Sequence, residues 1–188
     1  SECYNIKRSE KAHVVGINVI SEKSLIPYYN ETIDPIETYV AIYKSIRSLG
    51  YECKFFTNGV PRDMLTVKEI LNRLHLCAED SVLYPSHTLK GSSFVKLLSS
   101  MSFIVSSRLH TSICAYSLRI PTVAFSWDDK ILTFYGHIGC PERCLDIKHL
   151  QNDYGYLSTL ISKAMAEGYD EQLYTANLKS VADSLASL

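Results

Sequence analysis

The sequence predicts an α/β domain in which helices cover both faces of a parallel sheet. Short runs rich in β-branched and aromatic residues alternate with segments of helical periodicity. Strands that alternate with helices in this way are joined by right-handed crossovers, which makes the sheet parallel. A chain of 188 residues can form one well-filled core. We therefore expect a single Rossmann-like, doubly wound domain over residues 1–188.

Composition excludes several classes of protein. With 46% hydrophobic and 21% charged residues, the chain is too apolar for intrinsic disorder. No run approaches the ~18 uncharged apolar residues that a membrane span needs. The 19 basic and 20 acidic residues give a net charge of −1, which argues against a nucleic-acid-binding protein. The six cysteines are not spaced like a disulfide scaffold, so we expect mostly reduced, buried thiols and a cytoplasmic location.

The expected strands and helices follow from these patterns and from local stop signals. Asp34 and Pro35 suit the N-cap and first position of a helix that Gly50 ends. Pro121 separates a helix from the strand after it. The expected strands are 13–20, 51–57, 81–84, 103–106, 122–126 and 144–147. The remaining helices are expected at about 61–76, 92–100, 109–118 and 128–137, with two more between about 153 and 187.

The strongest candidate site lies where the strand 103–106 gives way to a helix. Ligands of such sheets bind beyond the carboxyl ends of the strands. Ser106 is placed to cap the helix, and Arg108 offers a planar set of donors for a carboxylate or phosphate. His110 lies in the first turn, where imidazole can bind an anion or exchange a proton near neutral pH. Together with the helix N-terminus, these groups predict an anion-binding site.

A second cluster follows the strand 122–126. Lys130 can add positive charge to the same site, and Trp127 can stack on a ring. Asp128 and Asp129 are better explained by helix capping. After the strand 81–84, Ser86 and His87 are interpreted as residues of a solvated loop.

Other motifs do not support a metal or nucleotide site. Cys140 and Cys144 lie near His137 and His149, but the spacing is loose and no second cysteine pair exists, so no metal is expected. The chain has no glycine-rich phosphate loop and no G-x-S-x-G nucleophile elbow.

The segment 106–139 resembles the polysaccharide pyruvyl transferase family. Members show S-x-R-L-H, a proline, a lysine and a later F-x-x-x-x-G stretch. The matching residues here are Ser106, Arg108, Leu109, His110, Ala115, Pro121, Lys130, Phe134 and Gly139. The chain departs from the pattern at Trp127, where tyrosine is usual, and at Arg119, where glycine often ends the helix.

The resemblance implies an architecture and a reaction. Such enzymes resemble glycosyltransferase-B-type proteins, with two Rossmann-like halves around a cleft, and this chain is similar to the carboxyl-terminal half. Because it begins with Ser1, we expect it to be a processed chain or part of a longer protein whose N-terminal half is its partner, and to be inactive alone. The implied reaction moves a pyruvyl group from phosphoenolpyruvate to a sugar of a cell-surface polysaccharide, with no further cofactor.

The resemblance also implies roles for particular residues. His110 would act as general acid or phosphate ligand. The implied substrate-binding residues are Ser106, Arg108, Leu109, Ser126, Trp127 and Lys130.

Two other functions remain open from the sequence. One is the donor-binding domain of a nucleotide-sugar glycosyltransferase, although no acidic ribose-binding residue follows a strand. The other is a non-catalytic domain that binds an anion or a partner protein.

Overall fold

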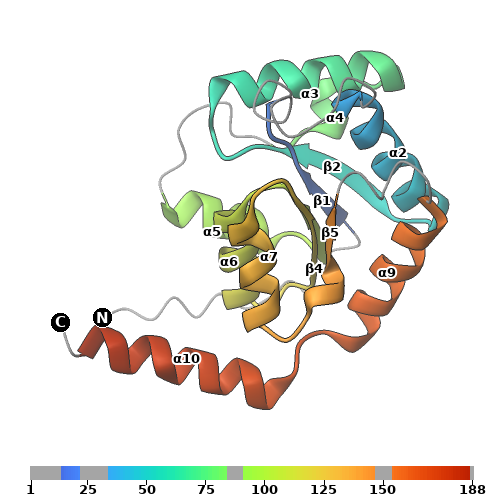
Figure 1. Cartoon of the computed structure of the whole chain (residues 1–188). Helices are drawn as coiled ribbons and strands as arrows, with labels where there is room; N and C mark the ends of the chain where they lie inside the picture. Colours follow the sequence, from blue (N-terminus) through green and yellow to red (C-terminus); the bar gives the residue numbers. More distant parts are fainter. Residues whose placement is uncertain (1–13, 22–33, 84–90, 147–153, 187–188) are drawn as a thin grey trace.

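The computed structural model describes residues 14–21, 34–83, 91–146 and 154–186. In these residues, five strands form one all-parallel sheet in the order β2-β1-β3-β4-β5. Figure 1 shows the helices on both sides of the sheet. The strands are β1 (Val14–Asn18), β2 (Glu52–Phe56), β3 (Phe103–Ser106), β4 (Thr122–Ser126) and β5 (Cys144–Asp146). The predicted α/β class and parallel sheet are confirmed.

The strand expected at 81–84 is wrong at Ser81, and of the described residues 81–83 only Val82 pairs with the sheet. Ser81 ends the short helix α4 (Ala78–Ser81), and Val82 forms a single parallel bridge to Phe55. The acidic residues Glu79 and Asp80 favour a helical turn here, because negative charge stabilises a helix N-terminus. With Val82 counted as an outermost strand, the order becomes 3-2-1-4-5-6, which is that of dinucleotide-binding Rossmann sheets.

Three helices cover one face of the sheet: α2 (Pro35–Ser48), α3 (Pro61–Leu74) and α9 (Tyr154–Glu167). Alternate strand residues such as Val15, Ile17 and Val105 pack against their apolar faces. The Asp34 side chain caps α2 by accepting hydrogen bonds from the amides of Ile36 and Glu37. The predicted cap is therefore confirmed.

The opposite face is covered by α5 (Gly91–Ser99), α6 (Leu109–Ser117) and α7 (Asp129–His137). A short 3₁₀ turn, η2 (Pro141–Arg143), leads into β5. The last helix, α10 (Glu171–Ala186), packs Tyr174 against Tyr116 of α6 and lies along the edge of the molecule in Figure 1. The sheet is doubly wound, as the sequence predicts.

Arg119 occupies the left-handed backbone region that glycine usually provides after a helix. Its φ is 56°, and it follows the C-cap Leu118 of α6. Its guanidinium lies over the ring of Tyr174, with 4.4 Å between the carbon Cζ and the ring centroid. The departure from the family pattern, arginine in place of glycine, therefore affects the backbone conformation at the end of α6.

The five cysteines in the described part of the chain carry free thiols. Cys53, Cys140 and Cys144 are buried, whereas Cys77 is exposed. Among the described residues, no helix is both long and apolar enough to cross a membrane.

Candidate functional site

The candidate site lies beside the point where the sheet changes direction. Strands β1 and β3 are neighbours, and the chain winds outward from them toward opposite edges. Their carboxyl ends leave a crevice in which ligands of open α/β sheets bind. Here β1 ends at Asn18 and β3 ends at Ser106.

Two similar turns connect the strands to the helices of the site. Ser106 Oγ donates to the carbonyl of Arg108 at 2.9 Å, and the Arg108 amide donates back to Ser106 Oγ at 3.2 Å. In the next unit, Ser126 Oγ donates to the carbonyl of Asp128 at 3.2 Å. Arg108 and Asp128 are the N-caps of α6 and α7. The sequence predicts Ser106 as the cap of α6, but the N-cap is Arg108, two residues later, and Ser106 Oγ binds the backbone of the turn instead.

The two helix N-termini differ in how their amides are satisfied. The Asp128 side chain caps α7 by accepting a hydrogen bond from the Lys130 amide at 2.8 Å. This confirms the capping role predicted for Asp128. The N-cap of α6 is Arg108, whose side chain makes no such bond. The first amides of α6 are therefore the ones left for an anion.

A cavity of about 400 Å³ lies in front of these two turns. Its lining residues are Asn58, Arg108, Leu109, His110, Trp127, Asp128, Lys130 and Ile131. Five of the seven predicted site residues thus share one cavity. The other two, Ser106 and Ser126, are not among the lining residues, because their hydroxyl groups bind the backbone of the turns.

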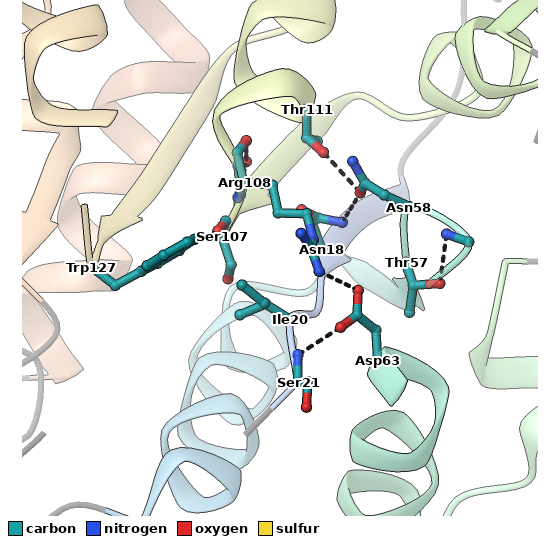
Figure 2. Close-up of polar contacts among 12 residues, drawn as sticks. Asn18, Ile20, Ser21, Thr57, Asn58, Asp63, Ser107, Arg108, Thr111 and Trp127 are labelled. Atoms are coloured by element: carbon teal, nitrogen blue, oxygen red, sulfur yellow. Dashed lines mark hydrogen bonds and ion pairs between the residues drawn. The ribbon is translucent and has the colours of Figure 1, made fainter. Parts of the chain in front are cut away.

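Arg108 is held by a buried carboxylate. Its Nη2 lies 2.6 Å from Asp63 Oδ2, and Asp63 Oδ1 accepts a hydrogen bond from the Ser21 amide at 2.8 Å (Figure 2). The Asp63 side chain is 0% exposed, and that of Arg108 is 24% exposed. Arg108 Nε is buried and has no hydrogen-bond partner among the described residues. The guanidinium is thus fixed at one end and lines the cavity.

This ion pair alters the charge that the sequence predicts for the site. The positive charge of Arg108 is balanced by Asp63, and Asp128 adds a carboxylate to the cavity wall. Lys130 is exposed and forms no ion pair with any described residue. His110 is exposed as well. Lys130 therefore supplies the positive charge that no ion pair holds, and Arg108 contributes directed donors.

A chain of hydrogen bonds fixes Trp127, which lines the cavity. The Ile20 amide donates to Tyr39 Oη at 3.1 Å, and Tyr39 Oη lies 2.9 Å from Ser107 Oγ. Trp127 Nε1 donates to the Ser107 carbonyl at 2.7 Å. Burial raises the pKa of Tyr39 to about 12, so its hydroxyl stays protonated at neutral pH. The indole that was expected to stack on a ring is held in place by its N–H group.

A second network crosses from β1 through the turn after β2 to α6. Asn58 Oδ1 accepts hydrogen bonds from Asn18 Nδ2 at 2.8 Å and from Thr111 Oγ1 at 3.1 Å (Figure 2). Asn18 and Thr111 are both 0% exposed. The network therefore places Asn58 firmly at the cavity wall.

Sequence reasoning missed two of these functional positions. Asn58 directly follows the expected strand 51–57, which is the right place for a ligand contact, but no motif around it marks it as a site residue. Asp63 resembles an ordinary acidic residue of a first helical turn, so nothing local distinguishes it. Ser86, His87 and His149 lie outside the described residues. Within the described ranges, no three His, Cys, Asp or Glu residues are grouped to hold a metal ion.

Comparisons with known proteins assign the chain to a family. The family model described as polysaccharide pyruvyl transferase matches residues 17–129, more than half of the chain. The curated proteins contain no match. A solved structure of a Thermobaculum terrenum O-GlcNAc transferase mutant is similar over 94% of this chain, with 13% sequence identity and a TM-score of 0.49. This chain covers 36% of that one.

The matched region includes both strand–helix turns and most of the cavity wall, from the end of β1 to the start of α7. Lys130 lies immediately after its last residue. The chain belongs to the polysaccharide pyruvyl transferase family.

Proposed function

We propose that this chain is the donor-binding part of an enzyme that transfers a pyruvyl group from phosphoenolpyruvate to a sugar of a cell-surface polysaccharide. The observation that carries the proposal is that Arg108, His110 and Lys130 line one cavity at the open N-terminus of α6. The family supports a polysaccharide-modifying transferase, and the cavity supports an anionic donor. The free cysteines support a cytoplasmic location.

The proposed donor carries two anionic groups, a phosphate and a carboxylate. One would bind to the α6 amides and to the end of Arg108 that Asp63 does not occupy. Lys130 would bind the other as a mobile point charge. Leu109, Trp127 and Ile131 form an apolar side of the cavity that suits the methylene group.

The proposed reaction needs a proton at carbon and a good leaving group. Protonation of the donor's methylene carbon gives an oxocarbenium-like centre, which one sugar hydroxyl attacks. A second hydroxyl then displaces phosphate to close the ketal. One hydroxyl proton balances the new methyl group, and the other balances the released hydrogen phosphate. His110 is placed to exchange such a proton or to bind the departing phosphate.

The second half of the enzyme is part of the proposal. Within the cavity wall and its ion pair, the charges of Arg108 and Lys130 are matched by those of Asp63 and Asp128. A trianionic donor would bind more tightly with further cations, which we propose the N-terminal half supplies across a cleft of glycosyltransferase-B type. The acceptor sugar would enter from that side.

Calorimetric titration of residues 1–188 with phosphoenolpyruvate tests the binding step. We expect saturable binding that Lys130→Ala weakens about tenfold, which is about 1.4 kcal/mol. Lys44→Ala on the exposed side of α2 is the matched control and should bind as the wild type does. Binding of a uridine or guanosine diphosphate sugar without any binding of phosphoenolpyruvate would overturn the proposed donor.

Phosphate release tests the chemistry. We expect residues 1–188 to release no phosphate with a saccharide acceptor, and the full-length protein to do so. In the full-length protein, His110→Gln should lower kcat at least about 100-fold, the usual size of a general acid–base contribution. Full turnover by His110→Gln would exclude His110 as the acid.

A further inference from the structure

Asn58 combines cavity exposure with an amide whose orientation is set from behind. It follows β2 directly, is half-buried, and lines the cavity beside Arg108. Its oxygen Oδ1 accepts from both Asn18 Nδ2 and Thr111 Oγ1. Because both partners are fully buried donors, the oxygen is held toward the protein interior.

The other end of the amide is left for a ligand. Asn58 Nδ2 has no hydrogen-bond partner among the described residues. Because Nδ2 is not buried and Asn58 lines the cavity, its N–H groups are accessible to a ligand there. An amide nitrogen carries two donors and no charge.

Arg108 offers a second donor from the neighbouring turn. Asp63 binds Nη2. The other terminal nitrogen, Nη1, has no partner among the described residues and is not buried. Thr111, which binds Asn58, lies one helical turn after Arg108 on α6. The Asn58 network thus connects the two donor-bearing turns, and Asn58 and Arg108 line the same cavity.

We propose that Asn58 is a substrate-binding residue, whose Nδ2 donates to the same anionic group of the donor substrate that Arg108 binds. The identity of that substrate rests on the proposed function. Because Asp63 already neutralises Arg108, an uncharged donor beside it increases the number of hydrogen bonds to the anion without further positive charge. Asn58 therefore contributes to recognition of oxygen position rather than to attraction of charge.

Two substitutions separate the donor from the network. Asn58→Asp keeps an oxygen that accepts from Asn18 and Thr111 but replaces the donor with a carboxylate oxygen. We expect an unchanged Tm and at least about a tenfold loss of phosphoenolpyruvate affinity, the scale of a lost hydrogen bond to a charged group. Asn72→Asp, on the exposed surface of α3, adds the same charge elsewhere and should bind normally.

Asn58→Ala and Thr111→Val control for local charge and for loosening of the network. Both break the hydrogen bond between Thr111 Oγ1 and Asn58 Oδ1, but only Asn58→Ala removes the donor. We expect Asn58→Ala to lose at least three times more affinity than Thr111→Val, measured by calorimetry below the Tm of both. Competition by inorganic phosphate and by pyruvate then identifies the anionic group that Asn58 contacts. Asn58→Ala should weaken the binding of phosphate if Nδ2 contacts the phosphate group, and the binding of pyruvate if it contacts the carboxylate.

Equal losses in Asn58→Ala and Thr111→Val, or wild-type affinity in Asn58→Asp, would overturn the assignment of Asn58 while the proposed function stands. If the wild-type chain binds a nucleotide sugar and not phosphoenolpyruvate, the proposed function is wrong. The same four variants titrated with that sugar then decide the role of Asn58 separately, with the same expected ranking.

Discussion

The ion pair between Arg108 and Asp63 links the stability of the fold to the proposed binding of the donor substrate. Asp63 is fully buried at the start of α3, and its carboxylate binds the Arg108 guanidinium and the Ser21 amide. The pair therefore connects the Arg108 side chain, at the N-terminus of α6, to the segment that follows β1. It also means that a loss of binding in an Arg108 variant has to be separated from a loss of folding.

Arg108→Ala should lower the free energy of unfolding by about 3–5 kcal/mol, because it leaves the Asp63 charge buried without its partner. Adding Asp63→Asn should restore part of that loss, with a coupling of about 0.5–3 kcal/mol in a double-mutant cycle measured by urea denaturation. Strictly additive effects would mean that the two side chains do not interact in solution. Arg108→Lys keeps a positive charge at the position and is the variant for binding studies.

At the scale of the elements, Gly16 lets β1 pack closely against the face covered by α5 and α6. A Cβ atom at this position would lie 2.1 Å from Met101 Sδ and 2.9 Å from Phe56 Cε1. Both neighbours are fully buried, so neither side chain can move away into solvent. The position of β1 matters for the candidate site because the strand ends at Asn18 and Ser21 lies three residues further along the chain.

Gly16→Ala should reduce the free energy of unfolding by about 1–3 kcal/mol through overpacking. The matched control is Gly136→Ala in α7, where nothing lies within 4 Å of the added Cβ and φ is not positive. That change should stabilise the domain by about 0.5–1 kcal/mol, because alanine loses less backbone entropy in a helix. Thermal denaturation of both variants measures whether each change stabilises or destabilises the domain. Effects in the same direction would contradict the close packing at Gly16.

At the scale of the whole molecule, buried phenol and thiol groups limit stability in alkali. Burial raises the pKa of Tyr39 from 10.0 to about 12 and that of Cys53 from 9.0 to about 12. Between pH 9 and 12 the folded chain therefore binds more protons than the unfolded chain. The stability contributed by these groups is complete below their unfolded pKa values and is lost as the pH rises through the folded values.

The free energy of unfolding should accordingly be level near neutral pH and fall above pH 9, by about 1.4 kcal/mol per pH unit for each proton involved. Urea denaturation followed by circular dichroism at pH 7, 9, 10 and 11 checks this. Cys53→Ala should make the decline shallower between pH 9 and 10. A stability that stays constant up to pH 11 would show that these groups are solvated in the folded protein.

Much of the fold follows from local signals. The strands at 103–106 and 122–126 are found where the sequence predicts them, because both are short apolar runs bounded by stop signals. The start of α2 follows from Asp34 and Pro35, which satisfy a helix N-terminus whatever surrounds it. The prediction of a strand from Ser81 fails because the apolar run there is too short to override the competing helical turn at Ala78–Ser81.

Local sequence is enough to predict the alternation of strands and helices, the two strand–helix turns, and five of the residues that line the cavity, because these depend on neighbours along the chain. The charge of the site and the rest of its wall depend on tertiary contacts. Asp63 and Asn58 reach Arg108 and Thr111 across 45 and 53 positions of sequence, through parallel strand pairing. No local pattern records such a contact, since it exists only after β1, β2 and β3 have been placed side by side.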